Sequence, residues 1–374
     1  MPTLPDILEI KPLTRPPNCT ITIPGSKSIT NRALILAALS KGKCTLRGAL
    51  WADDTQVMVD SLQRLDFVVT VSPVDENSNC TIVVEGRGGE IPAKKAELYV
   101  GNAGTAARFL TALVCRGHGE YRIAGDPRMH ERPMGELFRA LGLPGEHLPV
   151  TIHATGMKPA RLRVRGVESS QFASALMLVG HEVETEPHAY VEMTREMLRS
   201  FQPDYAIEPD LSGASYFVAA GFLTDGKVNV AGWPMNSLQV DGRFPGFLPP
   251  PARVSRQTDL GDSVMTLAIC ALFGRQPMKL VEGERLRVQE CDRISAVVTE
   301  LKRVGAKAEE HADGFTVWPS DRLHGADIET YNDHRMAMCF GVLGLKVPGI
   351  RIKNPACVRK TFPNFFEKLE QLRQ

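Results

Sequence analysis

A short turn near the N-terminus carries residues that could bind an anion. The turn Pro24–Arg32 reads PGSKSITNR and lies between an alternating segment, 19–23, and an apolar run, 33–39. This order predicts a strand, a tight turn and a helix. The first turn of a helix has unpaired backbone N–H groups and a dipole that favours anions. Lys27 and Arg32 stand at that position, although an N-cap serine beside two solvated cations explains this turn taken alone.

The same arrangement recurs five more times along the chain. Polar or charged turns lead into apolar runs at 110–114, 172–179, 215–222, 265–273 and 336–345. Runs that are apolar nearly all round predict buried helices, and the recurrence predicts a repeated unit. After the opening strand the elements read helix, strand, helix, strand, strand, with the closing hairpin at 67–71 and 80–84. We therefore expect two domains of three such units each.

Length and proline content bound this architecture. At 374 residues the chain is too long for one compact core and suits two domains. The fourth repeat lacks its second helix, because the segment 244–252 (FPGFLPPPA) carries prolines that forbid a regular helix. We expect an α/β (α+β) fold with a truncated fourth unit.

Charge and cysteine usage exclude several classes of protein. The formal net charge is +1, so no nucleic-acid surface is indicated. No apolar run is long enough to span a bilayer, and the cysteines and histidines form no C-x-x-C or H-E-x-x-H pattern. Cys115 lies inside an apolar run and is interpreted as a buried, inert thiol. We predict a soluble, cytoplasmic protein without a structural metal.

Cations are concentrated at the predicted helix starts and tight turns. In a chain that is otherwise nearly neutral, this concentration favours a cleft for a substrate with several negative charges. The cations are Lys27, Arg32, Arg128, Arg132, Arg293, Arg335 and Lys360. Two acids, Asp262 and Glu290, stand among them. A carboxylate near a hydroxyl can act as a base, but Asp262 equally fits an N-cap, so both interpretations stay open.

Seven motifs, in order from near one end of the chain to the other, resemble the signatures of a known family. They are PGSKSITNR (24–32), GNAGT (101–105), DPRMHERP (126–133), SSQ (169–171), RVQECDR (287–293), YNDHR (331–335) and KTFP (360–363). These motifs are similar to those of the 3-phosphoshikimate 1-carboxyvinyltransferases, which are also called 5-enolpyruvylshikimate-3-phosphate (EPSP) synthases.

The resemblance implies a fold, a domain division and a reaction. The fold is a two-domain inside-out α/β barrel with three β-α-β-α-β-β units in each domain. The domains are 1–22 with 241–374, and 23–240, so the chain crosses near Ile23 and near Asp241. The reaction moves the enolpyruvyl group of phosphoenolpyruvate to the 5-hydroxyl of shikimate 3-phosphate and releases phosphate, without a metal or organic cofactor. We expect a cytoplasmic monomer that acts on small molecules, without nucleic-acid or membrane partners.

The resemblance also assigns roles to residues at matching positions. The expected catalytic residues are Lys27, Asp262 and Glu290. Phosphoenolpyruvate is expected to contact Lys27, Gly104, Arg128, Arg293, Arg335 and Lys360. Shikimate 3-phosphate is expected to contact Ser28, Arg32, Ser169, Ser170, Thr185 and Asp262, with Gln171 shared between the substrates. Asp262 would take the proton of the attacking hydroxyl, and Lys27 and Glu290 would transfer protons at the methylene carbon of phosphoenolpyruvate.

Two positions depart from the family pattern. Arg285 stands where the family usually has an asparagine, and Gln289 replaces a lysine that would help to hold the shikimate phosphate. As a hypothesis, Arg285 supplies the missing charge from the other end of the same strand. Both residues are therefore included among the expected substrate contacts.

Three related functions compete with this interpretation. The sister enolpyruvyl transferase of UDP-N-acetylglucosamine shares the architecture, but its opening turn reads GAKN and it usually carries a reactive cysteine loop. Here the turn reads GSKS (25–28), and 126–133 contains no cysteine. A paralogue for another phosphorylated cyclitol stays open because of Gln289. A catalytically weak binding homologue is disfavoured, since the three expected catalytic residues are all present.

Overall fold

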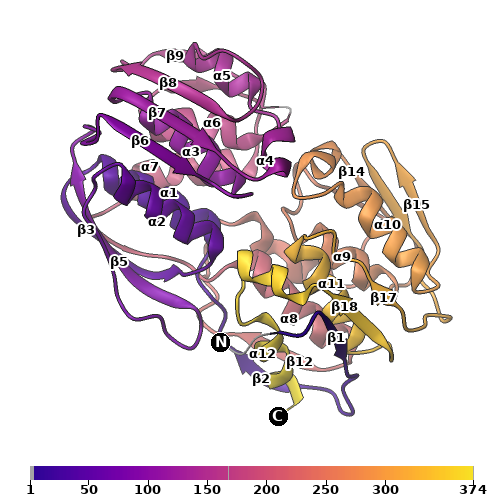
Figure 1. The fold of residues 1–374 in the computed structure, drawn as a ribbon. Coiled ribbons are helices and arrows are strands. Elements are labelled where there is room, and N and C mark those ends of the chain that lie inside the picture. The colour runs from indigo at the N-terminus through magenta and orange to yellow at the C-terminus, as the bar shows by residue number, and fades with distance from the viewer. Residues whose placement is uncertain (1–3, 167, 374) are drawn as a thin grey trace. The chain divides into compact units, whose positions relative to one another are not determined.

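The structure, a computed structural model, describes residues 4–166 and 168–373. The chain divides before Gly25 and after Glu208 into two compact units. We call Gly25–Glu208 the central unit, and the described residues on either side of it, 4–24 and 209–373, the discontinuous unit (Figure 1). The first division adjoins the expected crossing near Ile23.

The second division lies well before the expected crossing near Asp241. The strand β12 (Lys227–Val230) pairs in parallel with β2 (Asn18–Ile21), and α8 (Leu211–Leu223) packs on β12. Because β12 pairs with a strand of the N-terminal segment, the residues after Glu208 belong to the discontinuous unit. Sequence periodicity does not report such a pairing, because the partner strand is about two hundred residues away.

Among its described residues the central unit has three sheets. One has the strand order β11-β3-β5-β4, one the order β6-β7-β8, and the third pairs β9 with β10. The strands are β3 (Lys41–Leu50), β4 (Val69–Val71), β5 (Asn79–Arg87), β6 (Lys95–Tyr99), β7 (His118–Ala124), β8 (Val150–Thr155), β9 (Arg161–Arg163), β10 (Glu182–Glu184) and β11 (Asp204–Ala206). The helices are α1 (Lys27–Leu39), α2 (Asp53–Arg64), α3 (Gly104–Val114), α4 (Pro127–Glu131), α5 (Gly135–Leu141), α6 (Ser170–Leu178) and α7 (Ala189–Ser200).

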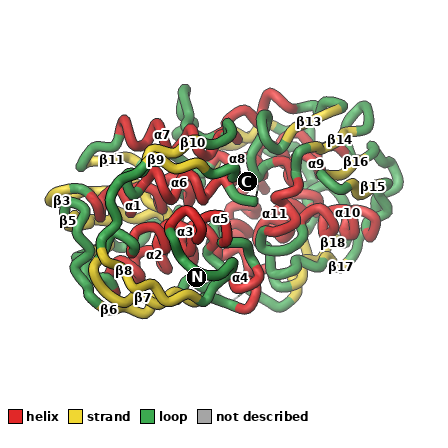
Figure 2. Tube along the Cα trace, turned by 90° about the horizontal axis from the view of Figure 1, so that it is seen from above, coloured by secondary structure: helices red, strands yellow, loops and turns green. Residues whose placement is uncertain are grey.

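Three helices, α1, α3 and α6, form the interior of the central unit. They are largely buried and pack on one another, and Figure 2 shows strands of the unit outside them. The guanidinium carbon of Arg32 in α1 lies 5.3 Å from the ring centre of Phe109 in α3, and Arg32 Nη2 lies 3.2 Å from Ser174 Oγ in α6. All three residues belong to the second turns of their helices. The three helices therefore begin at the same end of the unit.

The discontinuous unit repeats this plan among the residues that the structure describes. Its sheets have the orders β13-β14-β16-β15 and β1-β18-β17, and β12 pairs with β2. Its other strands are β1 (Ile7–Ile10), β13 (Arg253–Ser255), β14 (Met278–Val281), β15 (Ala308–His311), β16 (Gly314–Val317), β17 (Asp327–Ile328) and β18 (Ile350–Lys353). Its other helices are α9 (Val264–Ala271), α10 (Arg293–Arg303), α11 (His334–Gly344) and α12 (Phe365–Glu370), with 3₁₀ helices η1 (Val240–Phe247), η2 (Glu284–Val288), η3 (Pro355–Lys360) and η4 (Gln371–Arg373).

The helices α8, α9 and α11 form the interior of the discontinuous unit. They pack on one another, and polar side chains join them near their first turns. Ser215 Oγ in α8 lies 2.9 Å from Thr266 Oγ1 in α9, which lies 3.9 Å from Cys339 Sγ in α11. These helices also begin at one end of their unit.

The two four-stranded sheets share one pattern of strand directions. In both, the first pair of strands is parallel and the next two pairs are antiparallel. The order of elements also agrees, since α1-β3-α2-β4-β5 corresponds to α9-β14-α10-β15-β16. The expected hairpin is present, with Val69 opposite Val84 in β4 and β5. The segment 244–252 contains no α-helix, as its prolines predicted, and η1 takes the place of a second helix.

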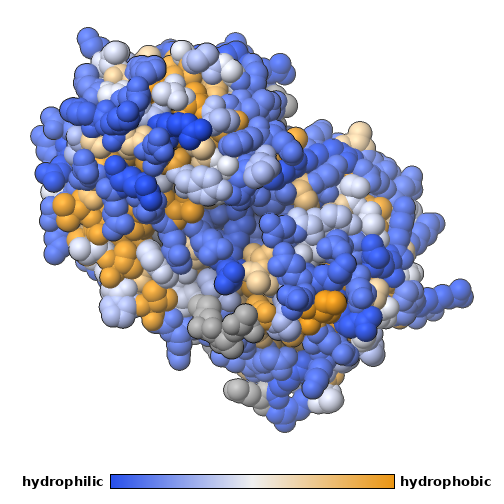
Figure 3. All heavy atoms as spheres, viewed as in Figure 1, coloured by the Kyte–Doolittle hydropathy of each residue, from blue (hydrophilic) through white to orange (hydrophobic). Residues whose placement is uncertain are grey.

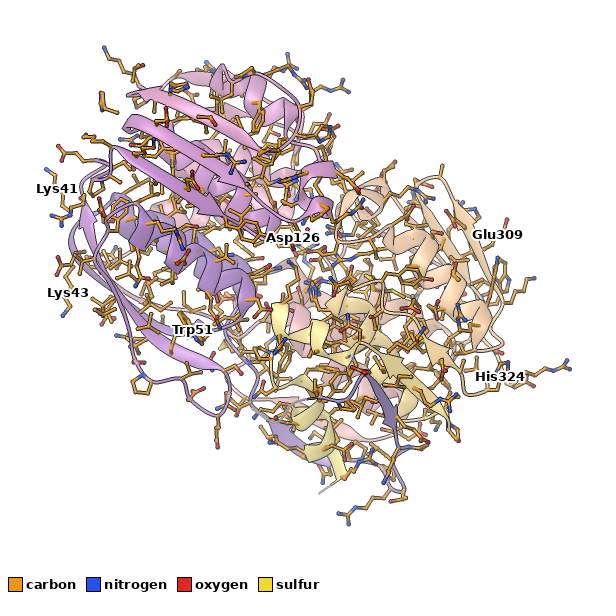
Figure 4. The ribbon with its side chains drawn as sticks, in the orientation of Figure 1. Lys41, Lys43, Trp51, Asp126, Glu309 and His324 are labelled. Atoms are coloured by element: carbon orange, nitrogen blue, oxygen red, sulfur yellow. The ribbon has the colours of Figure 1, made fainter. Side chains whose placement is uncertain are left out.

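Charged side chains lie on the outer faces of both four-stranded sheets. Lys41 and Lys43 on β3 point away from the central unit, and Glu309 on β15 points away from the discontinuous unit (Figure 4). The surface over β15 and α10 is largely hydrophilic in Figure 3. Within 4–166 and 168–373 no helix is long and apolar enough to cross a membrane, and no cluster of His, Cys, Asp and Glu side chains could hold a metal ion.

Gly86 in β5 lies directly against the end of a buried helix of the central unit. A Cβ there would collide with the carbonyl oxygens of Ala37 and Ser40, at the C-terminal end of α1. We expect Gly86→Ala to lower the free energy of unfolding by about 1–3 kcal/mol, because the strand must move away from α1. Urea unfolding measures this change.

Gly246→Ala is the matched control for this prediction. A Cβ at Gly246 has no atom within 4 Å, and the φ angle of Gly246 lies outside the left-handed region. This replacement should leave the free energy of unfolding unchanged or slightly higher. Equal unfolding midpoints for the two variants would contradict the assigned role of Gly86.

Candidate active site

In the central unit Lys27 pairs with a carboxylate that the sequence analysis did not select. Lys27 Nζ lies 3.1 Å from Asp54 Oδ2, and the two side chains are 14% and 4% exposed. Asp54 lies in the first turn of α2, whose N-cap is Ala52. This short, buried ion pair aims the ammonium of Lys27. The sequence did contain a signal for Asp54. Two acidic residues, Asp53 and Asp54, stand together at the start of α2, and a helix start needs only one of them as a cap, so the other is available for a second role.

Gly104, the first residue of α3, lies against two arginines. A Cβ at Gly104 would lie 2.6 Å from Arg108 Nη1 and 2.6 Å from Arg132 Nη2. Arg132 Nη1 also donates to both oxygens of Asn102, each at 3.1 Å. Glycine therefore lets the helix start and the guanidinium of Arg132 come together, which suits anion binding. Arg132 belongs to this group although it was not among the expected contacts.

The start of α6 adjoins the start of α3. Ser169 is the N-cap of α6, and its Oγ accepts a hydrogen bond from Gln171 N at 3.2 Å. Gln171 Nε2 donates to Thr105 Oγ1, also at 3.2 Å. The structure therefore brings Gln171 and the turn at Ser169 and Ser170 next to Gly104.

Arg128 and Thr185 are placed by short elements. Arg128 in α4 pairs with Glu131 at 2.8 Å, and its side chain is 35% exposed. Thr185 follows β10 and lines a pocket of about 780 Å³, together with three arginines and three glutamates. A Cβ at Gly166 would lie 3.4 Å from Thr185 Oγ1 and 3.6 Å from the Ser169 carbonyl oxygen. Thr185 therefore lies near the start of α6.

Arg32 is buried between three helices of the central unit. Its guanidinium is buried and donates to Thr194 Oγ1 at 2.8 Å, to Ser28 O at 2.9 Å, and to Ser174 Oγ and Tyr190 O at 3.2 Å each. Burial lowers the pKa of Arg32 to about 10, which still leaves it charged at neutral pH. In this arrangement Arg32 joins α1 to α6 and α7, and every nitrogen of the guanidinium has a protein partner.

In the discontinuous unit Asp262 is surrounded by arginines. Its Oδ1 lies 2.7 Å from Arg256 Nη2 and 3.8 Å from Arg293 Nη1, and its Oδ2 lies 2.9 Å from Arg335 Nη2. The N-cap of α9 is Ser263. The N-cap interpretation of Asp262 is therefore wrong, because its carboxylate faces cations. Arg256 was missed, since no helix start or motif marks it.

Arg293 connects Asp262 to two further carboxylates. Its side chain is 1% exposed, with Nε 2.7 Å from Asp333 Oδ2 and Nη2 3.0 Å from Glu290 Oε2. Burial alone would lower the pKa of Arg293, but Asp333, Glu290 and Asp262 outweigh burial and raise it. Asp333, also missed, is the N-cap of α11 and accepts a hydrogen bond from Arg335 N at 2.8 Å. One carboxylate thus fixes the starts of α10 and α11 together.

Glu290 lies between Arg293 and the last expected cation. Lys360 Nζ, at the end of η3, lies 3.9 Å from Glu290 Oε1, and their side chains are 13% and 8% exposed. Gln289 Oε1 accepts a hydrogen bond from Arg293 Nη1. The structure therefore brings together Asp262, Glu290, Gln289, Arg293, Arg335 and Lys360.

Arg285 is not on a strand, contrary to the expectation. It lies in η2, where Leu286 N bonds to Gly283 O at 2.8 Å and the Leu286 side chain is buried. The short 3₁₀ turn forms because burial of the Leu286 side chain brings Leu286 N back to the carbonyl oxygen of Gly283. Arg285 and Gln289 accordingly lie on one turn and its C-cap.

Cys115 is a buried thiol, as predicted. Its thiol donates to the Thr111 carbonyl oxygen at 3.2 Å, and burial raises the pKa of Cys115 to about 12. The thiol is therefore protonated at neutral pH.

Both groups of residues have the means for anion recognition and proton transfer. Three helices begin at one end of each unit, and their N–H groups and dipoles favour anions. The central unit adds Lys27 and Arg132. The discontinuous unit adds four cations, Arg256, Arg293, Arg335 and Lys360, beside the carboxylates of Asp262 and Glu290.

Comparisons with known proteins agree with these features. The family model for EPSP synthase (3-phosphoshikimate 1-carboxyvinyltransferase) matches residues 14–204, 202–244 and 255–369. A 3-phosphoshikimate 1-carboxyvinyltransferase of Trichormus variabilis is 38% identical, over 97% of this chain and 98% of that protein. One of Laribacter hongkongensis is 38% identical, over 95% and 96%.

Solved structures share the fold. EPSP synthase from Acinetobacter baumannii has a TM-score of 0.73 at 21% identity, over 98% of each chain. The enolpyruvyl transferase NikO from Streptomyces tendae has a TM-score of 0.74 at 18% identity, over 98% of this chain and 97% of that one. At this low sequence identity, the structural likenesses show the fold alone. The family is shown by the sequence matches, which cover nearly the whole chain. The chain therefore belongs to the EPSP synthase family.

Proposed function

We propose that this protein is a 3-phosphoshikimate 1-carboxyvinyltransferase. It transfers the enolpyruvyl group of phosphoenolpyruvate to the 5-hydroxyl of shikimate 3-phosphate and releases phosphate. The observation that carries this proposal is the pair of carboxylates, Asp262 and Glu290, held among the four cations Arg256, Arg293, Arg335 and Lys360, in a chain that is 38% identical to relatives of that name. The family match favours this reaction over the other acceptors and over a binding homologue.

The carboxylates and Lys27 divide the proton transfers. Asp262 takes the proton of the acceptor hydroxyl, whose oxygen forms a bond to C2 of phosphoenolpyruvate. Glu290 or Lys27 delivers a proton to the methylene carbon, which gives a tetrahedral intermediate. The same residues then remove a proton from the new methyl group as the bond from C2 to the phosphate oxygen breaks. Lys27 is aimed for this work by Asp54.

Cations and helix starts hold the anionic groups. By the resemblance, we expect phosphoenolpyruvate to contact Lys27, Gly104, Arg128, Gln171, Arg293, Arg335 and Lys360. We expect shikimate 3-phosphate to contact Ser28, Arg32, Ser169, Ser170, Gln171, Thr185 and Asp262. Arg285 and Gln289 depart from the family pattern and are added to this second set as a hypothesis. Fixed donors stabilise charge that moves onto the leaving phosphate, because they need no rearrangement during the reaction. Arg32 also holds α1 on α6 and α7, through its contacts with Thr194 and Ser174.

The finer description of the fold is also a proposal. Each unit is a three-fold repeat of β-α-β-α-β-β elements around buried helices, an inside-out α/β barrel. Support comes from the shared strand directions of the two four-stranded sheets and from three parallel helices inside each unit. The fourth repeat is the truncated one, because η1 stands where its second helix is expected.

We also propose a cytoplasmic, monomeric enzyme that uses its two small-molecule substrates without a metal or organic cofactor. The side chains that the mechanism requires supply acid, base and anion-binding groups. All eight cysteines are free thiols, which suits a reducing compartment.

Asp262→Asn should lower kcat by about 10²–10⁴-fold, because the amide cannot accept the hydroxyl proton. Glu290→Gln should have a similar effect on kcat, since it removes a proton donor. The assay is phosphate release from phosphoenolpyruvate, with and without shikimate 3-phosphate. Asp321→Asn, at an exposed position, is the control. Wild-type kcat in Asp262→Asn would contradict the assigned base.

Lys27→Met should lower kcat by about 100-fold or more, because it removes a proton-transfer group. Asp54→Asn should also lower kcat, since the ammonium loses the carboxylate that aims it. The double variant should be no slower than Lys27→Met alone, because both changes act through one ammonium. Steady-state kinetics measure all three variants, and additive losses would contradict a shared role.

Arg285→Ala should raise the KM for shikimate 3-phosphate and leave the KM for phosphoenolpyruvate unchanged. The reason is that Arg285 supplies the charge that Gln289 lacks, and a charge-assisted hydrogen bond contributes about 1.5–3 kcal/mol. Gln289→Lys in the same background should restore the KM. An unchanged KM in Arg285→Ala would remove the hypothesis.

A further inference from the structure

Arg256 makes a contact that fold stability does not explain. It follows β13, and its N donates to Val281 O at 3.0 Å, so its backbone is anchored on β14. Its side chain is 7% exposed, and Nη2 donates to Asp262 Oδ1 at 2.7 Å. Its Nε is buried without a hydrogen-bond partner among the described residues. An unpaired buried donor is unfavourable, which points to a functional reason for burying this arginine.

The other two arginines at Asp262 have a second task. Arg293 and Arg335 are the cations that the resemblance assigns to phosphoenolpyruvate. An arriving carboxylate or phosphate competes with Asp262 for them, because guanidinium groups pair readily with either anion. In the structure, Arg335 Nη2 lies 2.9 Å from Oδ2 of Asp262, and Arg256 Nη2 lies 2.7 Å from Oδ1.

The turn that carries Asp262 is held by a separate set of bonds. Asp241 Oδ1 accepts hydrogen bonds from Gly261 N and from Ser263 Oγ, both at 2.6 Å. The backbone on either side of Asp262 is therefore anchored without Arg256. Loss of the Arg256 side chain should free the carboxylate of Asp262 and leave its turn in place.

We propose that Arg256 is a positioning residue for Asp262, an inference that rests on the proposed role of Asp262 as the base. Arg256 keeps Oδ1 in place after Arg335 has turned to the anionic substrate. Oδ2 is then uncovered and accepts the proton of the acceptor hydroxyl. Displacement of a catalytic base by about 1 Å lowers the rate of the chemical step about a hundredfold. The contact between Arg256 and Asp262 therefore affects kcat and not substrate affinity.

The test compares Arg256→Ala with Arg253→Ala, which removes the same charge from an exposed position at the start of the same strand. We expect Arg256→Ala to lower kcat by about 10-fold to 100-fold, with both KM values near those of the wild type. Arg256→Lys should recover part of the loss. Arg256→Ala combined with Asp262→Asn should be no slower than Asp262→Asn alone, because both changes act on one carboxylate. Thermal unfolding is recorded for every variant.

A kcat in Arg256→Ala equal to that of Arg253→Ala overturns the proposal. A raised KM for phosphoenolpyruvate with unchanged kcat also overturns it, because Arg256 would then bind substrate directly. If Arg256→Ala does not fold, Arg256→Lys decides: kcat below that of Arg253→Ala supports the proposal, and equal kcat overturns it. Wild-type kcat in Asp262→Asn removes the base itself, and absent phosphate release by the wild type with both substrates removes the proposed function. These two results are distinct from a failure of Arg256 alone.

Discussion

The site depends on where the buried helices begin. In the central unit α1, α3 and α6 start at one end, and α8, α9 and α11 do the same in the discontinuous unit. Each start offers unpaired N–H groups and the positive end of a helix dipole. Contacts between neighbouring helices, such as Arg32 with Ser174 and Ser215 with Thr266, hold the helix N-termini beside one another within each unit. The short turns that precede these helices then need to add only a few charged side chains to form an anion-binding site.

The buried charges at the helix starts are not explained by fold stability alone. Burying a guanidinium or a carboxylate removes its hydration, and the attraction between partners often only offsets that loss. Arg293 is 1% exposed and faces Asp333, Glu290 and Asp262. Hydrophobic side chains would fill this space at a lower cost in desolvation free energy. The cluster is understandable if a substrate replaces some of these pairs, since it then meets donors that are already desolvated and aimed.

The elements were predictable where local chemistry decides them. Apolar runs bounded by Gly104 or by Ser169 became buried helices, and the prolines of 244–252 excluded an α-helix. Other features depend on distant partners. Asp262 fits an N-cap by sequence, and only the structure excludes this, because Ser263 is the N-cap of α9 and Asp262 pairs with Arg256 and Arg335. The position of Arg285 on a 3₁₀ turn followed from burial of Leu286, which spacing alone does not reveal.

The sequence by itself determined the repeated turn-and-helix plan, the family and most of the residues that we propose for anion binding, because periodicity, turn residues and motifs act over a few neighbouring positions. Only the tertiary structure decided which charges meet. Asp54 with Lys27, Asp333 with Arg293 and Arg256 with Asp262 are pairs of this kind. It also turned Arg32 inward and assigned the residues after Glu208 to the discontinuous unit. The physical reason is that ion pairs and strand pairing join residues far apart in sequence, so they form only when packing brings those residues together.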